Sequence, residues 1–434
     1  MSDYLIQKIK SRWILDSRGN PTVETEVYIN DEFARSAVPS GASTGVLEAL
    51  ELRDGGKDFL GKHVTKAVRN VNEILGKKLI GFDVREQQKI DEEMISLDGT
   101  DNKRNIGANA ILSVSLSVAK LAAKLLNKPL FSHIYELSHN KSKENFLLPI
   151  PCCNIINGGK HAGNNLAIQE FMILPIGAAN FSMAIQNVVE VYQTLKKLLN
   201  EKFGNSAINV GDEGGFAPNI SGTREAFDVI IEAIEAAGFL MGTDFVLGID
   251  AAASEFFNED LYFIDGKKLY EEELLQYYLD LIHDYPLKSI EDPFDEKSFR
   301  GFTNLTAKID KTIQIVCDDL TVTNIKILEK AINEKAGNAL LLKVNQIGTL
   351  TEAIKACRLA FGNGFNVMVS HRSGETEDSF IADLSVGLCS GQIKSGAPCR
   401  SDRTSKYNQL LRIEELLGKN ANYPESYSSW KNYQ

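Results

Sequence analysis

The sequence has few cysteines, no long uninterrupted apolar run and no excess of positive charge, and each absence excludes a class of protein. Its six cysteines show neither metal-ligand spacing nor a dense disulfide framework, so we expect reduced thiols and a cytoplasmic location. The first residues, MSDYLIQKIKSRW, lack the apolar core of a signal peptide. The longest apolar stretch begins at Ala108 but is interrupted by Lys120 and Lys124, so we expect a buried helix there and no membrane span.

The charge balance is acidic and disfavours two kinds of partner. The chain has 47 Lys and Arg against 58 Asp and Glu, which gives a net charge of −11. Such a balance disfavours binding to nucleic acid and to anionic membranes. It does not exclude an anionic small substrate in a locally basic pocket. With 434 residues, the chain is too long for one ordinary core, and we expect more than one domain.

The N-terminal third has the pattern of a small α+β domain. Residues 21–30 (PTVETEVYIN) alternate as a strand does, and EFARSAVP follows directly, which predicts a hairpin. Helical patterns then occupy roughly 63–80, 84–96 and 108–127. The polar segment 137–144 (LSHNKSKE) predicts a linker. We therefore expect an N-terminal α+β domain over 1–138 and a second domain over 145–434.

Six short apolar runs in the second half of the chain each end in a polar or charged residue. Each run is followed by helix-like sequence, as expected of a buried parallel strand in a βα unit. The ends recur roughly every 25 to 40 residues, which is the length of a strand, a helix and their loops. Repeated units of this length predict a (β/α) barrel, whose chemistry lies at the carboxyl ends of its strands. These ends are marked by Asp250, Glu291, Asp318, Lys343, His371 and Lys394.

The three acids Asp250, Glu291 and Asp318 follow successive predicted strands, so their carboxylates are expected to converge. Three hard oxygen ligands favour Mg²⁺ over zinc, for which His or Cys would be expected. Alternatively, each acid caps the helix that follows its strand. Three acids in a row at the same topological position favour the shared metal site.

Lys343 lies inside the apolar run LLLKVN. In a barrel strand, its side chain could lie only in the barrel interior or at the barrel mouth. Desolvation beside other cations would lower its pKa and let it act as a general base near neutral pH. The alternative is a buried salt-bridge partner for a neighbouring acid. The nearby group His371, Arg372, Ser373 and Lys394 carries donors that suit phosphate or carboxylate, although a solvated charged loop has the same composition.

Three glycine-rich loops add candidates. His161 lies in INGGKHAGNN (155–165), which is flexible enough for a lid, although a lone histidine is more often structural. Glu213 lies in GDEGGFAP, where the neighbouring glycines let an acid approach a ligand closely. The segment PSGASTG (39–45) lacks the Gly-Lys-Ser/Thr ending of a phosphate loop, so we expect a closing lid.

Long segments across the whole chain resemble the enolase family, and more closely its eukaryotic members. They include ILDSRGNPTVE, VPSGASTG, NGGKHAGN, QEFMILP, GDEGGFAP, SIEDPF, DDLTVTN, LLLKVNQIGT, SHRSGETED and GQIKSGAP. The resemblance implies an α/β chain with an N-terminal α+β capping domain and a C-terminal modified (β/α)₈ TIM-type barrel. It also implies a phosphopyruvate hydratase, a carbon–oxygen lyase, that uses two Mg²⁺ ions to interconvert 2-phospho-D-glycerate and phosphoenolpyruvate.

The resemblance also implies roles for individual residues. Asp250, Glu291 and Asp318 resemble the ligands of one Mg²⁺, and Ser40 resembles a residue that holds the second. Lys343 resembles the base that removes the proton alpha to the substrate carboxylate. Glu213 resembles the acid that protonates the departing hydroxyl, with Glu170 beside it and His161 in a closing loop. The residues expected to contact substrate are His161, Glu170, Glu291, Asp318, Ser370, His371, Arg372, Ser373 and Lys394.

Two other functions are compatible with the same scaffold. One is a sister enzyme that abstracts an alpha proton from another acid, such as a racemase or a lactonising enzyme. GDEGGFAP and SHRSGETED disfavour it, because they resemble the phosphoglycerate-specific branch. The other is a non-catalytic binding or structural role, which the full set of candidate catalytic residues disfavours.

The segments EDPF and DDLTVTN resemble eukaryotic relatives and favour a homodimer.

Overall fold

The N-terminal part of the chain is an antiparallel sheet covered by helices. The computed structural model describes residues 4–41, 45 and 47–424 and, of His161, the backbone alone. Strands β1 (Lys8–Leu15), β2 (Pro21–Ile29) and β3 (Glu32–Ala37) pair in that order. The predicted hairpin is confirmed. Asn30 has a φ of 53° at its turn, a left-handed conformation that asparagine tolerates.

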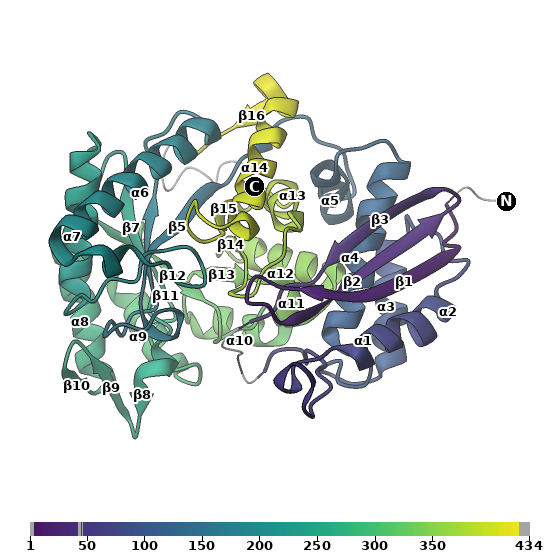
Figure 1. Cartoon of the computed structure of the whole chain (residues 1–434), viewed down its shortest axis with the longest axis horizontal. Coiled ribbons are helices and arrows are strands. Elements are labelled where there is room, and N and C mark those ends of the chain that lie inside the picture. The colour runs from purple at the N-terminus through teal and green to yellow at the C-terminus, as the bar shows by residue number, and fades with distance from the viewer. Residues whose placement is uncertain (1–3, 42–44, 46, 425–434) are drawn as a thin grey trace.

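Helix α4 (Ala108–Leu125) joins the two parts of the molecule (Figure 1). One of its faces carries Ile111 and Val114 into the core beneath β2, and the opposite face carries Leu112 and Leu116 into the barrel core. A helix that is buried on two sides must be apolar nearly all round. This is the one described helix that is long and apolar enough to cross a membrane, and 83% of it is buried inside the structure, as is usual for a core helix.

The remaining N-terminal helices pack around α4 and the sheet. They are α1 (Thr65–Asn70), a π-helical turn (Val71–Leu75), α2 (Gly76–Lys78), α3 (Gln87–Asp98) and α5 (Leu130–His139). Helix α5 runs into the segment expected to be a linker. It continues to His139 because Tyr135 and Ser138 extend the buried face begun by Phe131 and Ile134.

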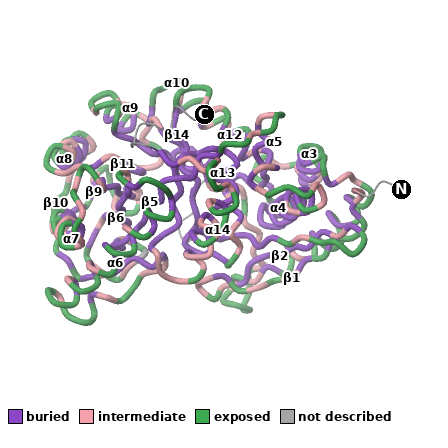
Figure 2. Tube along the Cα trace, turned by 90° about the horizontal axis from the view of Figure 1, so that it is seen from above, coloured by how far each residue is buried: buried purple, intermediate pink, exposed green. Residues whose placement is uncertain are grey.

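The C-terminal part is a closed eight-stranded barrel, which confirms the predicted fold class. The strands follow the order β11-β12-β13-β14-β15-β5-β6-β7. Figure 2 shows buried chain concentrated in the interior of the molecule. The strands are β5 (Ile150–Asn157), β6 (Glu170–Leu174), β7 (Val246–Asp250), β11 (Leu287–Glu291), β12 (Gln314–Cys317), β13 (Ala339–Leu342), β14 (Asn366–Ser370) and β15 (Gly391–Lys394).

Strand β6 departs from the parallel arrangement, since it pairs antiparallel with both β5 and β7. In such a barrel the carboxyl ends of the parallel strands share one rim. Because β6 runs the other way, its first residue lies at that rim, where Glu170 pairs with Asp250 and with Asn157. The reversal therefore adds a carboxylate to the functional end of the barrel.

Helices cover the barrel, and several of them begin at a capping side chain. Asn180, Asn324 and Thr349 each accept a hydrogen bond from a backbone N–H of the first helical turn, which satisfies an otherwise unpaired donor. The helices are α6 (Phe181–Phe203), α7 (Thr223–Ala236), α8 (Glu271–Asp284), α9 (Phe299–Lys308), α10 (Ile325–Glu334), α11 (Val344–Ile347), α12 (Leu350–Gly362), α13 (Phe380–Gly387) and α14 (Ser401–Leu417).

Two small sheets complete the fold. Strands β8 (Phe257–Asn258), β9 (Leu261–Ile264) and β10 (Lys267–Leu269) form an antiparallel sheet inserted between β7 and α8. Strand β4 (Phe146–Leu147) pairs with β16 (Ala421–Asn422) near the end of the described chain. Neither sheet was predicted from the sequence, because strands this short carry too few residues for an alternating pattern.

Candidate active site

A cavity at the carboxyl ends of the barrel strands brings most of the predicted site residues together. Ser40 and Glu291 are not among the residues that line it, although Glu291 contacts Lys394, which does. The backbone of His161 lies in a single 3₁₀ turn (Gly159–His161), and its side chain lies outside what the structure describes. The lining residues are Gln169, Glu170, Glu213, Asp250, Ala252, Asp292, Asp318, Asp319, Lys343, Ser370, His371, Arg372, Ser373 and Lys394.

Lys394, at the end of β15, forms ion pairs with three acids from strands across the barrel mouth. Its Nζ lies 2.9 Å from Asp250 Oδ2, 2.8 Å from Glu291 Oε2 and 3.2 Å from Glu170 Oε2. In the barrel order, β15 and β11 lie four strands apart, so the long lysine side chain crosses the mouth. Burial alone would lower the pKa of Lys394, but the surrounding carboxylates outweigh it and raise that pKa well above its usual value.

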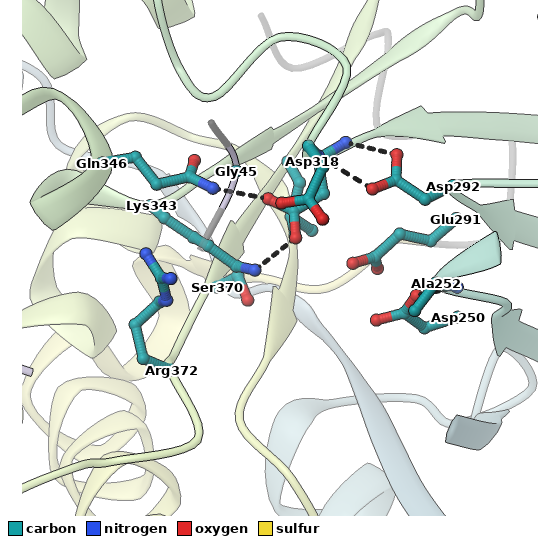
Figure 3. Close-up of polar contacts among 12 residues, drawn as sticks. Gly45, Asp250, Ala252, Glu291, Asp292, Asp318, Lys343, Gln346, Ser370 and Arg372 are labelled. Atoms are coloured by element: carbon teal, nitrogen blue, oxygen red, sulfur yellow. Dashed lines mark hydrogen bonds and ion pairs between the residues drawn. The ribbon is translucent and has the colours of Figure 1, made fainter. Parts of the chain in front are cut away.

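Lys343 follows β13 and forms a partly buried ion pair with Asp318, which follows β12 (Figure 3). The expected lowering of the pKa of Lys343 is wrong for this arrangement. Burial lowers it, and Arg372 and Lys394 also lower it, but Asp318 and Glu291 prevail and the pKa is raised. The ion pair with Asp318 is instead the alternative left open from the sequence, a salt bridge between Lys343 and a neighbouring acid.

A group of three carboxylates could hold a metal ion. One oxygen from each of Asp292, Asp318 and Asp319 lies within 4.8 Å of the others. Asp292 also accepts the backbone N–H groups of Asp318 and Asp319, at 3.0 and 2.8 Å. Burial and repulsion from Asp318 raise the pKa of Asp319 to about 8. Of the three predicted metal ligands, Asp318 therefore belongs to this group, while Asp250 and Glu291 lie around Lys394.

The donor set fits a divalent cation bound through oxygen. Burial and the neighbouring Asp250 raise the pKa of Glu291 well above its usual value, so its charge lacks full compensation. Glu291 Oε1 is buried and accepts no hydrogen bond within the described part of the chain. Carboxylate oxygens without histidine or cysteine are the ligands of Mg²⁺ rather than of zinc.

His371 is a neutral, oriented imidazole beside Glu213. The guanidinium of Arg403 donates to His371 Nδ1, and arginine cannot be deprotonated in a protein, so this nitrogen must accept. The ring proton therefore lies on Nε2, which is 3.4 Å from Glu213 Oε2. Burial, supported by the charge of Arg403, lowers the pKa of His371 to about 3. Asn154 also donates to Glu213, at 3.2 Å.

The N-terminal domain contacts the mouth through charged side chains. Glu48 forms an ion pair with Arg372 at 3.0 Å, and Asn345 accepts from the same guanidinium at 3.1 Å. Arg18 donates to Ser373 Oγ at 3.3 Å. The predicted anion-binding arginine is thus held by a carboxylate, which an anionic ligand would have to replace. The predicted lid 39–45 lies in this region, but its residues 42–44 lie outside the described residues.

The other predicted residues have local partners. Ser40 Oγ donates to Glu51 at 2.9 Å and accepts from Arg53 at 3.0 Å. Ser370 Oγ donates to the carbonyl of His371 at 3.0 Å. Ser370 lines the cavity, whereas the backbone of Ser40 pairs with that of Gly374, the residue after the lining residue Ser373.

Sequence reasoning missed four residues that organise the site. Gln346 donates to Asp318 Oδ1 at 2.8 Å, and Arg403 orients His371. Asp292 accepts hydrogen bonds from the backbone of Asp318 and Asp319, and Glu48 forms an ion pair with Arg372. Gln346 and Asp292 lie next to motifs that were recognised, so their position was a usable signal. Glu48 and Arg403 are far in sequence from their partners, and no local pattern marks them.

The fold and the site define an enzyme of the TIM-barrel class whose cavity faces clustered carboxylates against cationic groups. Residues 145–431 match the family described as "Enolase, C-terminal TIM barrel domain", and residues 6–134 match "Enolase, N-terminal domain". The chain belongs to the enolase family. The predicted enzyme class, a phosphopyruvate hydratase and lyase, is confirmed by these matches and by the relatives that follow.

The similar proteins come from distant organisms. The chain is 55% identical to an enolase of Methanocaldococcus jannaschii over 95% of this chain and 96% of the relative. It is 56% identical to an enolase of Pyrococcus furiosus over 95% of both chains. It is 55% identical to an enolase of Solanum lycopersicum over 96% of this chain and 97% of the relative.

Replacing Arg403 with lysine should release the orientation of His371. An ammonium cannot reproduce the planar fork that contacts His371 Nδ1 together with the carbonyls of Arg372 and Ser373. We expect Arg403→Lys to lower kcat roughly tenfold to a hundredfold, since a misplaced group of this kind costs about that much. The ¹⁵N chemical shifts of the His371 ring should change from the Nε2–H tautomer to a mixture.

Arg412→Lys is the matched control, because Arg412 is an exposed arginine on the same helix α14. It should leave the tautomer and kcat unchanged. An unchanged His371 tautomer in Arg403→Lys would contradict the positioning role.

Proposed function

We propose that the chain catalyses the reversible dehydration of 2-phospho-D-glycerate to phosphoenolpyruvate, in glycolysis and gluconeogenesis, with two Mg²⁺ ions in the active site. The observation that carries the proposal is the cavity, in which Lys343 follows β13, Glu213 comes from the loop before α7, and both face one space. That space is also lined by Asp250 and Asp318, and Glu291 contacts the lining residue Lys394. A general base, a general acid and acidic metal ligands are the groups that this reaction requires.

Lys343 is the proposed base, and its environment supports the role once a cation is present. A proton alpha to a carboxylate is very weakly acidic, because its removal adds charge beside an existing anion. Mg²⁺, when bound, supplies positive charge to that carboxylate and to Asp318. With the charges of Asp318 and Glu291, both proposed ligands of the ion, offset, the remaining influences on Lys343 are burial, Arg372 and Lys394, each of which lowers its pKa.

Glu213 is the proposed acid, with Glu170 and His371 in support. Hydroxide leaves only when it is protonated, so the acid must hold a proton near neutral pH. Burial and the charge of Glu213 raise the pKa of Glu170 well above its usual value, which places a proton between these two carboxylates. His371, held neutral by burial and Arg403, directs its Nε2 toward Glu213.

Asp250, Glu291 and Asp318 are the proposed ligands of one Mg²⁺, and Ser40 the proposed contributor to the second site. The oxygens that Lys394 contacts, Asp250 Oδ2 and Glu291 Oε2, are the oxygens a divalent cation would take. Lys394 then becomes available to an anionic substrate. Arg372, Ser373 and Ser370 also line the cavity and are proposed to bind its phosphate and carboxylate, with His161 in the closing loop.

Location, assembly and domain boundaries complete the proposal. A homodimer is proposed from the resemblance to eukaryotic relatives, and a cytoplasmic location from the expected reduced thiols. The division into a capping domain over 1–138 and a barrel domain over 145–434 is proposed from the sequence. Two apolar cores support it, one beneath β2 and one within the barrel, with α4 contributing to both.

The direct test follows ultraviolet absorbance as 2-phosphoglycerate is added with Mg²⁺. The conjugated enol phosphate absorbs, whereas the substrate hardly does. We expect a rise that disappears with a chelator. No rise from folded, Mg²⁺-loaded protein would reject the proposed reaction.

Two variants should separate the two proton transfers. We expect Lys343→Ala to abolish deuterium exchange at the alpha carbon of 2-phosphoglycerate, because it removes the only group proposed to take that proton. Glu213→Gln should retain this exchange and lose phosphoenolpyruvate formation by about a hundredfold or more. Exchange that persists in Lys343→Ala would exclude Lys343 as the base.

Removing the Lys394 ammonium should strengthen metal binding while it weakens substrate binding. Lys394 competes for oxygens of Asp250 and Glu291, so its loss leaves these carboxylates to the cation. We expect Lys394→Ala to bind Mg²⁺ more tightly by isothermal titration calorimetry. The same variant should show little affinity for phosphoenolpyruvate. Weaker Mg²⁺ binding in Lys394→Ala would place the metal away from these oxygens.

A further inference from the structure

A second cavity lies outside the active site, between the end of α5, the segment that follows it, α12 and the residues after α13. Its volume is about 510 Å³, within the range of sites that hold small organic ligands. It shares no lining residue with the active-site cavity. The lining residues are Tyr135, His139, Lys141, Ser142, Lys143, Arg358, Phe361, Leu388 and Cys389.

The rim of this cavity is cationic, although the protein as a whole is acidic. Lys141, Lys143 and Arg358 line it, and none of the lining residues is Asp or Glu. Neither Lys141 nor Arg358 forms an ion pair within the described part of the chain, which contrasts with the net charge of −11. Their positive charges converge on one ring, since burial and then Lys141, Lys143 and Arg358 lower the pKa of His139.

The inner surface of the cavity is apolar and aromatic. The rings of Tyr135 and His139 stack at 4.1 Å with an angle of 16° between their planes. Phe361, half-buried, and Leu388, buried, also line the cavity. Lys143 is fixed within this surface, with its Nζ 5.2 Å from the centre of the Tyr135 ring and 3.4 Å from Cys389 Sγ. An apolar base beneath a cationic rim suits a ligand that is planar at one end and anionic at the other.

We propose that this cavity binds a small organic anion of the nucleoside phosphate class. Arg358 and Lys141 would hold the phosphates, since a guanidinium binds phosphate through two parallel hydrogen bonds and an ammonium binds it as a point charge. The base would lie against the rings of His139 and Phe361. This site does not depend on the proposed reaction, because the two cavities have no residue in common.

Calorimetric titration of the full chain with ADP tests the proposal. Adenosine and inorganic phosphate, each titrated alone, separate the two halves of the ligand. We expect ADP to bind at least tenfold more tightly than either, and phosphoenolpyruvate not to displace it. No binding at millimolar ADP, or displacement by phosphoenolpyruvate, would overturn the proposal. If inorganic phosphate bound as tightly as ADP, the cavity would bind anions without recognising the nucleoside, and the proposed ligand class would be overturned.

Substitutions on one exposed helix face locate the site. We expect Arg358→Gln to weaken ADP binding about tenfold, because it removes one charge-assisted contact. Lys355→Gln is the matched control, since Lys355 lies on the same helix, pairs with Glu92 and does not line the cavity. If both variants weakened ADP binding equally, the effect would come from the lost positive charge alone and not from a site at Arg358, and the proposal would be overturned. Both variants should keep the folded spectrum of the parent protein.

The ring of His139 offers an independent readout. His139 Nδ1 lies 3.2 Å from the carbonyl of Tyr135, its ring stacks on the Tyr135 ring, and Lys141, Lys143 and Arg358 are the charges that act on it. A bound phosphate offsets these cations, so ADP should raise the pKa of His139 in a proton NMR titration, while adenosine should not. A pKa that ADP leaves unchanged would place the phosphates elsewhere.

Discussion

The ammonium of Lys394, enclosed by Asp250, Glu291 and Glu170, is the interaction on which the functional end of the barrel depends. Buried charges are strongly unfavourable unless they are paired, and here three buried carboxyl groups lie within 3.2 Å of one buried ammonium. One lysine compensates acids from β6, β7 and β11, so it fixes the relative positions of their ends. The same arrangement leaves an excess of negative charge, which is the electrostatic condition for binding a cation.

The reversed strand β6 gives the barrel this excess. A simple parallel barrel would place the first residue of each strand at the opposite rim. Because β6 is antiparallel to its neighbours, Glu170 lies beside Asp250 and within reach of Lys394. The loop between β5 and β6 then begins and ends at the functional rim, where it carries His161. Topology and electrostatics are therefore linked at this one strand.

The N-terminal domain is joined to the barrel by apolar packing and by charge. Helix α4 contributes to both cores, and Asp378 in the barrel domain forms a partly buried ion pair with Lys120 of that helix. Closer to the site, Glu48 and Arg18 contact Arg372 and Ser373. The groups proposed to bind substrate are thus positioned by residues from the other domain. A ligand that replaces Glu48 at Arg372 would alter the contact between the domains.

The sequence by itself determined the strands and helices whose patterns are local, and the chemistry of the residues at the strand ends. The six apolar runs and the spacing of their ends were sufficient to predict a barrel, because strands buried on both faces require continuous apolar sequence and recur once per βα unit. The tertiary structure alone decided which charges touch. It placed Asp318 against Lys343, which reversed the expected pKa shift, and it brought Arg403 to His371. Such pairings depend on distances of a few ångströms between residues far apart in the chain, and a local pattern carries no such distance.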